Sequence, residues 1–226
     1  MRTAAILPVK RFTLAKQRLG ATVADPLRLD LAKAMVGDVL SVLASTGGLE
    51  LTLVVTNEPW AAETASGLGV LVVPDTAEAG QSAAVGLGIE RAVALGIERV
   101  LCVPGDCPAL DPSEIETLLE SSCADEVVVV PDRHGTGTNG LLLTPPGAIA
   151  PSFGPGSCER HRELTQAAGL PCRIARPSSL LLDIDTGADL AALRSRLSGE
   201  RVHAPRTRNV LGIGGERAWR ASHSAA

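Results

Sequence analysis

The feature that most constrains this chain is the regular alternation of continuously apolar segments with amphipathic ones. Apolar runs such as TAAILPV (3–9) and EVVVVPD (126–132) alternate with segments such as 26–43, where apolar residues recur at three- and four-residue steps. Strands that are apolar on both faces occur in parallel sheets covered by helices on each side. We therefore predict an α/β fold with a mostly parallel, mixed sheet and helices on both faces.

The same patterns predict the individual elements. We expect strands at 3–9, 49–56, 69–75, 99–106, 126–132 and 140–145, with short strands near Arg173 and Leu180. Helices are expected at 26–43, 59–68, 82–95, 158–168 and 188–197, and another is expected after Asp111, with Asp111 as its cap and Glu114 at the capping-box position. Periodicity is lost from about Gly199, so we expect one domain, 1–205, and a flexible C-terminal tail, 206–226.

Composition excludes several classes of function. A formal net charge of −4 disfavours a duplex nucleic acid partner, and an aromatic content of 2% without tyrosine disfavours stacking on single strands. No segment has the length of a membrane helix, and the N-terminus does not resemble a signal peptide, so we expect a cytoplasmic protein. The five cysteines form no C-x-x-C pair and the four histidines lack zinc-site spacing.

The segment HGTGTNG (134–140) matches the dinucleotide-binding pattern G-x-G-x-x-G. That fingerprint requires a helix directly after the glycines, whereas LLLTPP (141–146) is an apolar run stopped by two prolines. We therefore interpret the segment as a glycine-rich loop between two strands, one of them antiparallel to the rest of the sheet.

Two stretches stand at the ends of strands, where ligands bind in open α/β sheets. The segment PVKRFTLAKQRLG after the first strand carries Lys10, Arg11, Lys16 and Arg18, and it is either a phosphate-binding loop or a solvated basic loop. No P-loop pattern is present. The segment VPGDCP holds Asp106 at the tip of the fourth strand, as a ligand or as a turn residue that bonds its own backbone.

Two further stretches complete the candidate site. In LLLDIDTGADL, Asp183 and Asp185 lie on the same side of an extended segment, which favours a divalent cation, although Asp185 or Thr186 is also a candidate helix cap. In FGPGSCERHREL, Gly154, Gly156 and Ser157 precede a helix and predict an anion site or a simple cap. Basic loop, carboxylates and anion loop together indicate phosphoryl or nucleotidyl transfer.

These stretches, together with VPDTAEAGQSAAVGLGI (73–89), resemble the 2-phospho-L-lactate or phosphoenolpyruvate guanylyltransferases of coenzyme F420 biosynthesis over about residues 1–197. The resemblance implies a single-domain, Rossmann-like nucleotidyltransferase fold. It also implies a reaction in which GTP and a phosphorylated three-carbon acid give a guanosine diphospho adduct and pyrophosphate. A homodimer and transfer of the product to the next pathway enzyme are further expectations.

Carried over position by position, the resemblance assigns three groups of residues. Those implied to bind the nucleotide are Pro8, Val9, Lys10, Lys16, Arg18, Gln81, Ser82 and Gly105; Lys10, Lys16 and Asp106 are also implied to be catalytic. Those implied to hold Mg²⁺ are Asp106, Asp183 and Asp185, and those implied to bind the phosphoacid are Thr138, Asn139, Gly154 and Ser157. Many relatives carry threonine in place of Asn139, so a backbone contact is expected there.

The phosphoacid is already mostly a dianion at neutral pH, so it can attack the α-phosphorus of GTP without a catalytic base. The richness in alanine, leucine, arginine and glycine suggests a bacterium of high G+C content. For bacterial members the resemblance implies phosphoenolpyruvate more than 2-phospho-L-lactate, so we expect phosphoenolpyruvate as the acceptor. Two alternatives remain: a sugar-nucleotide or molybdopterin type of transferase with another acceptor, and a nucleotide-binding protein without turnover.

Overall fold

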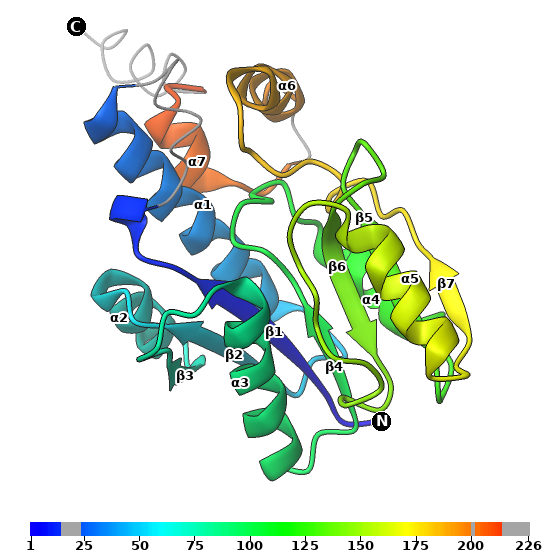
Figure 1. Cartoon of the computed structure of the whole chain (residues 1–226). Coiled ribbons are helices and arrows are strands. Elements are labelled where there is room, and N and C mark those ends of the chain that lie inside the picture. The colour runs from blue at the N-terminus through cyan, green and yellow to red at the C-terminus, as the bar shows by residue number, and fades with distance from the viewer. Residues whose placement is uncertain (15–23, 200–201, 214–226) are drawn as a thin grey trace, which may run out of the picture.

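A computed structural model describes residues 1–14, 24–199 and 202–213. Seven strands form one sheet in the order β3-β2-β1-β4-β6-β5-β7 (Figure 1). The strands are β1 (Thr3–Val9), β2 (Leu51–Thr56), β3 (Leu71–Pro74), β4 (Arg99–Cys102), β5 (Val127–Pro131), β6 (Thr138–Leu143) and β7 (Cys172–Ile174). Only β6 pairs antiparallel to its neighbours, β4 and β5. The predicted mixed, mostly parallel sheet is confirmed.

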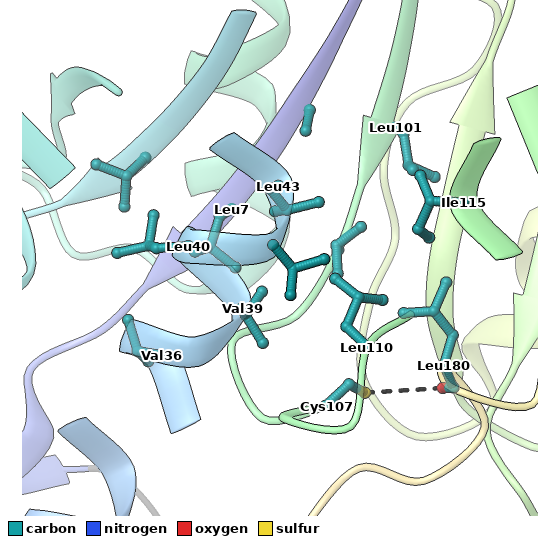
Figure 2. Packing of buried hydrophobic residues seen from close by; sticks show 14 of the residues in the cluster. Leu7, Val36, Val39, Leu40, Leu43, Leu101, Cys107, Leu110, Ile115 and Leu180 are labelled. Carbon is teal, nitrogen blue, oxygen red and sulfur yellow. Dashed lines mark hydrogen bonds between the residues drawn. The ribbon is translucent and has the colours of Figure 1, made fainter. Parts of the chain in front are cut away.

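Helices cover both faces of the sheet, as predicted. One core cluster packs α1 (Asp25–Ser45), α2 (Pro59–Gly67) and α4 (Pro112–Glu120) on one face, and a second packs α3 (Gln81–Ala94) and α5 (Ser157–Ala167) on the other. Figure 2 shows the first cluster, in which Leu7 of β1 lies among Val36, Leu40 and Leu43 of α1. This two-sided burial explains why the strands read as continuous apolar runs.

Two local predictions need correction. Residues near Leu180 form a turn and not a strand; Leu180 is fully buried, and its carbonyl accepts from Cys107 Sγ at 3.7 Å (Figure 2). Asp111 caps α4 by accepting from the Ser113 N–H, as predicted, but Glu114 does not complete a capping box. Its carboxylate instead accepts from the Ser179 N–H at 2.7 Å, a long-range contact that local sequence does not show.

The C-terminal segment differs from the expected tail. After α6 (Gly187–Leu197), residues Pro205–Val210 form the short helix α7, which packs against α1. The buried carboxylate of Asp38 accepts from the N–H groups of Arg206 and Thr207 at 3.1 and 2.8 Å. A third core cluster contains Ala204 and Leu211. A six-residue helix is too short to show periodicity, which is why the sequence did not predict it. Because Ile213 also packs against the third cluster, the packed part of the chain extends to at least residue 213.

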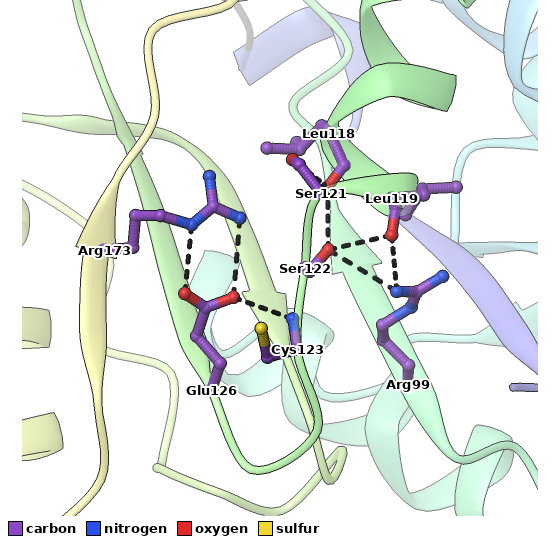
Figure 3. A network of polar contacts seen from close by, with 8 residues as sticks. All are labelled: Arg99, Leu118, Leu119, Ser121, Ser122, Cys123, Glu126 and Arg173. Atoms are coloured by element: carbon purple, nitrogen blue, oxygen red, sulfur yellow. Dashed lines mark hydrogen bonds and ion pairs between the residues drawn. The ribbon is translucent and has the colours of Figure 1, made fainter.

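Buried and half-buried charged side chains hold the end of the sheet at which α4 connects to β5. Arg99 of β4 donates to the carbonyl of Leu119 at 2.8 Å, and Arg173 of β7 pairs with Glu126 at 3.0 Å (Figure 3). The N–H of Cys123 also donates to Glu126. These contacts fix the connection between α4 and β5. The loops at the opposite end of the sheet, after the carboxyl ends of the parallel strands, are where a ligand site is expected.

Candidate active site

A cleft of about 1000 Å³ lies at the carboxyl ends of the strands. It is lined by the segment after β1, the start of α3, the loop after β4, the connection between β5 and β6, and the loop before α5. The strands β1 and β4 are parallel neighbours. After β1 the chain continues to β2 on one side, and after β4 it continues to strands on the other side, so the strand order reverses between β1 and β4. The cleft therefore occupies the switch point at which open α/β sheets bind ligands.

Three carboxylates meet in this cleft. Asp106, Asp183 and Asp185 each offer one oxygen, and these oxygens all lie within 4.8 Å of one another. The N–H of Ile184 donates to the carbonyl of Asp106 at 3.1 Å, which ties the extended segment to the loop after β4. Burial raises the pKa of Asp183, and the charge of Asp106 raises this pKa further. Crowded oxygen donors of this kind fit a hard divalent cation.

Of the two candidate caps of α6, Asp185 and Thr186, the structure shows Thr186. Thr186 is the cap of α6: its hydroxyl accepts from the N–H of Asp189, and the Asp189 carboxylate accepts from the N–H of Thr186. Asp189 also pairs with Arg133, which lines the cleft. The capping role is thus filled by other residues, while Asp183 and Asp185 both lie in the acidic cluster.

Asn139 connects β6 to the acidic cluster. The β5–β6 register shifts here, with Val130 opposite Gly140 but Pro131 opposite Thr138, so Asn139 is the extra residue of a bulge. Its buried amide Nδ2 donates to the Leu180 carbonyl at 2.8 Å and to Asp183 Oδ1 at 3.1 Å. The side chain of Asn139 therefore orients a carboxylate of the cluster.

The loop before α5 is shaped by Arg160. Its guanidinium donates to the carbonyls of Ser152, Phe153 and Pro155, which turns these carbonyls toward the helix. Gly154 and Gly156 have φ of +111° and +72°, in the region that favours glycine. The N–H groups of Ser152, Phe153 and Ser157 are bonded within the protein, so the N–H of Gly154 is the candidate of this loop for an anion in the cleft. Gly154 and Ser157 both line this cleft, and Ser157 is the first residue of α5.

The basic loop is only partly described. Lys10 is exposed and lines the cleft, whereas Arg11 pairs with Glu78 at 2.8 Å. Glu78 also accepts from Asn57 at 2.8 Å. Lys16 and Arg18 lie outside the described residues.

The other residues expected near the nucleotide are placed as follows. Pro8, Val9, Gln81 and Gly105 line the cleft. A Cβ on Gly105 would lie 2.9 Å from Val36 Cγ2, so close packing on α1 requires glycine there. Ser82 is not among the lining residues; its hydroxyl accepts from the Phe153 N–H at 2.9 Å and so joins α3 to the loop before α5.

Sequence reasoning missed residues that shape the loops. Asp132 accepts from the Thr136 N–H at 2.9 Å, and a Cβ on Gly137 would lie 2.8 Å from an oxygen of Asp132, which explains that glycine. His161 is fully buried and contacts Thr138. The polar HGTGTNG segment indicates that its threonines have hydrogen-bond partners. No sequence pattern identifies His161 of α5 as the partner of Thr138.

Comparison with solved structures identifies the fold. A nucleotidyl transferase from Methanothermobacter superposes with a TM-score of 0.60 at 18% identity, covering 86% of this chain and 97% of that one. A 4-diphosphocytidyl-2C-methyl-D-erythritol synthase superposes with a TM-score of 0.61 at 14% identity, covering 87% and 98%. These superpositions show that the chain has the Rossmann-like fold of these two proteins.

Sequence comparison narrows this fold to a family. The family model for guanylyl transferases of the CofC-like type matches residues 3–213, and the chain belongs to this family. It is 49% identical over 213 residues to the phosphoenolpyruvate guanylyltransferase of Conexibacter woesei, covering 93% of this chain and 96% of that protein. It is 33% identical over 204 residues to the 2-phospho-L-lactate guanylyltransferase of Methanothermobacter thermautotrophicus, covering 90% and 88%. The described part of the chain contains no helix long and apolar enough to cross a membrane.

Proposed function

We propose that the chain transfers GMP from GTP to phosphoenolpyruvate, or less favourably to 2-phospho-L-lactate, and so acts in coenzyme F420 biosynthesis. A phosphate oxygen of the acid forms a bond to the α-phosphorus of GTP, and the bond from that phosphorus to the oxygen bridging to the β-phosphate breaks, which releases pyrophosphate. The observation that carries the proposal is the convergence of the acidic cluster, Lys10 and the loop before α5 in one cleft at the switch point.

The residues have distinct proposed roles. Asp106, Asp183 and Asp185 would hold Mg²⁺, which when bound neutralises charge on the triphosphate. Lys10 contacts the triphosphate, with Lys16 and Arg18 expected to join it, and Pro8, Val9, Gln81 and Gly105 contact the nucleotide. The backbone at Asn139 and Gly154, with Thr138 and Ser157, holds the acid. Ser82 stays a predicted neighbour of the nucleotide, and its hydroxyl accepts from the Phe153 N–H, which joins α3 to the loop before α5.

This arrangement meets the main difficulty of the reaction. A triphosphate and a phosphorylated acid repel each other, and no base is needed because the acceptor phosphate is mostly a dianion. Catalysis therefore rests on positioning and on charge neutralisation. Lys10 supplies positive charge in the cleft, and the loop before α5 supplies the N–H of Gly154.

The preference for phosphoenolpyruvate is supported by the names of the more similar relatives. The two acids differ at one carbon, planar in one and bearing a methyl group in the other. Such a shape difference is worth about 1–3 kcal/mol, so preference and not exclusivity is expected.

One experiment tests reaction and acceptor together. Purified protein receives GTP, Mg²⁺ and equimolar phosphoenolpyruvate and 2-phospho-L-lactate, and the products are identified by mass spectrometry alongside pyrophosphate release. A dominant phosphoenolpyruvate adduct is expected. A dominant lactyl adduct would overturn the preference alone, whereas no guanylylated product from either acid would overturn the function. Parallel reactions with ATP, CTP and UTP test the choice of base.

Three further expectations belong to the proposal. The cytoplasmic location rests on the sequence patterns described above, whereas the homodimer and the transfer of the product to the enzyme that consumes it rest on the resemblance. Light scattering of the purified protein tests the homodimer, and a single species of monomer mass would contradict it.

A further inference from the structure

His161 is a fully buried histidine of α5 to which the proposed reaction gives no role. Its Nδ1 lies 3.0 Å from Thr138 Oγ1, and its Nε2 accepts from the backbone N–H of Ser152 at 2.9 Å. Phe153 contacts the ring edge-on, with centroids 5.1 Å apart and an interplanar angle of 72°. The ring therefore bridges the start of β6 and the loop before α5, the two segments assigned to the phosphoacid.

The hydrogen bonds fix which nitrogen carries the proton. A backbone N–H can only donate, so Nε2 must present its lone pair to Ser152. A neutral imidazole has a single N–H, which must then be on Nδ1 and must donate to Thr138 Oγ1. Because that oxygen accepts from the ring, the hydroxyl hydrogen of Thr138 has to point elsewhere. Thr138 lines the cleft, so an anion bound there is a candidate partner for this hydrogen.

We propose that His161 is a positioning residue that makes the Thr138 hydroxyl an obligatory hydrogen-bond donor to the phosphoacid. This inference rests on the proposed function, because the anion it addresses is the acceptor of that reaction. The ring takes no part in proton transfer and touches no reacting atom. It sets the direction of one hydroxyl and holds the two acceptor segments at a fixed separation.

The surroundings of His161 support a fixed ring. Thr165 Oγ1 donates to the His161 carbonyl at 2.7 Å, and the N–H of Cys158 donates to the carbonyl of Thr136 at 3.1 Å. The neighbouring residue Arg160 binds Ser152 through both its carbonyl and its hydroxyl. The Ser152 N–H is thus presented to Nε2 by a loop that is itself held, so the ring cannot adopt the other tautomer without losing that bond.

The first test is the tautomer itself. Nitrogen chemical shifts of ¹⁵N-histidine-labelled wild-type protein, with His161 assigned by comparison with His161→Gln, should show a neutral ring protonated at Nδ1. This measurement uses no substrate. A ring protonated at Nε2 would overturn the inference whatever the enzyme catalyses.

The second test is kinetic. His161→Gln places an amide near Nε2, where its oxygen can still accept from Ser152, but leaves no donor near Nδ1. The KM for phosphoenolpyruvate should rise about tenfold, the loss of roughly one hydrogen bond to a charged group, while the KM for GTP changes by less than about twofold. An equal rise in both KM values would indicate general loosening and would overturn the inference.

A double substitution separates positioning from packing. In a Thr138→Val background the hydroxyl is absent, so His161→Gln should cause no further rise in the acceptor KM, whereas in Thr138→Ser its effect should persist. Equal effects of His161→Gln in the wild-type and Thr138→Val backgrounds would overturn the inference. If the wild-type protein forms no guanylylated product, the proposed function is wrong, and the acceptor role of Thr138 is wrong with it. If the product forms but the ring is protonated at Nε2, only the proposed role of His161 is wrong.

Discussion

Asn139 Nδ2 donates to Asp183 Oδ1 at 3.1 Å and so joins the strand assigned to the acceptor to the cluster assigned to the metal. The same amide donates to the buried carbonyl of Leu180. Asp183 is thus oriented by a side chain of β6, the strand assigned to the acceptor. Asp106 lies in the loop after β4, which is the neighbour of β6 in the sheet. Asn139 therefore links the candidate acceptor strand directly to the candidate metal site.

Replacing Asn139 should weaken metal binding. Asn139→Leu keeps the approximate shape but removes both hydrogen bonds, and it leaves the buried Leu180 carbonyl with one donor fewer. We expect the Mg²⁺ concentration for half-maximal activity to rise about tenfold, as for other residues that orient metal ligands, and the free energy of unfolding to fall by about 1–3 kcal/mol. Asn209→Leu, an exposed site on α7, is the matched control. An unchanged Mg²⁺ requirement would contradict this link.

The carboxylates of the acidic cluster should support activity but lower the stability of the metal-free protein. Asp183→Asn and Asp106→Asn should each lower turnover at saturating Mg²⁺ by at least about 100-fold, because one charged ligand is lost. Without metal, Asp183→Asn should be more stable than wild type, since burial and Asp106 both disfavour its charge. Thermal unfolding in EDTA measures this, with the exposed Asp30→Asn as control. Near wild-type turnover in either variant would refute the metal assignment.

Lys10 should act on the nucleotide alone. Lys10→Ala removes one charge-assisted contact to the triphosphate, so the Kd for GTP measured by calorimetry should rise about tenfold or more. The Kd for phosphoenolpyruvate should change much less, because Lys10 is assigned to the triphosphate and not to the acceptor. Lys33→Ala on α1 removes an equal charge and controls for the overall field. Equal weakening of both ligands would count against the assignment.

Much of the fold was predictable because its determinants are local. A strand such as Val127–Pro131 is buried on both faces and shows this as an unbroken apolar run, and Asp111 with Pro112 marks the start of α4 by short-range capping. The features that were missed are long-range. Glu114 bonds Ser179 across 65 residues, and α7 is stabilised by Asp38 across more than 160 residues. No periodicity within a window of the sequence records such contacts.

The site was predictable to a different depth. Asp183 and Asp185 stand two residues apart and Asp106 stands at a strand end, so general rules for open sheets bring them together, and the structure does so. The part played by Asn139 depended on a bulge in β6, and that of His161 on the packing of α5 against the loop at 152. These depend on tertiary geometry that residue spacing does not encode.

Removing the C-terminal segment should destabilise the domain, contrary to what a tail beginning near residue 206 would imply. Truncation after Leu197 removes Ala204 and Leu211 from the third core cluster and takes both backbone donors from the buried Asp38 carboxylate. We expect a loss of several kcal/mol, about the sum of one cavity and one uncompensated buried charge, seen as a large fall in Tm. Truncation after Ile213 is the comparator and retains these contacts. Equal Tm values for the two truncations would show that α7 contributes nothing.

The buried ring of His161 should make stability depend on pH. Burial, aided by the positive charge of Arg160, lowers the pKa of His161 from 6.5 to about 4. The folded state therefore favours the neutral ring, while the unfolded chain takes up a proton below about pH 6.5. The contribution of the neutral ring to the free energy of unfolding is therefore complete above pH 6.5. It is lost progressively as the pH falls toward 4, by up to about 3 kcal/mol at 1.36 kcal/mol per pKa unit.

Chemical denaturation of wild type and His161→Gln at intervals between pH 7 and 4 isolates this contribution from that of the carboxylates, which both proteins share. The stability of wild type relative to the variant should fall steadily as the pH falls below 6.5. A constant difference across the range would mean that the histidine titrates alike in the folded and unfolded states. In that case the ring is not held neutral between Thr138 and Ser152.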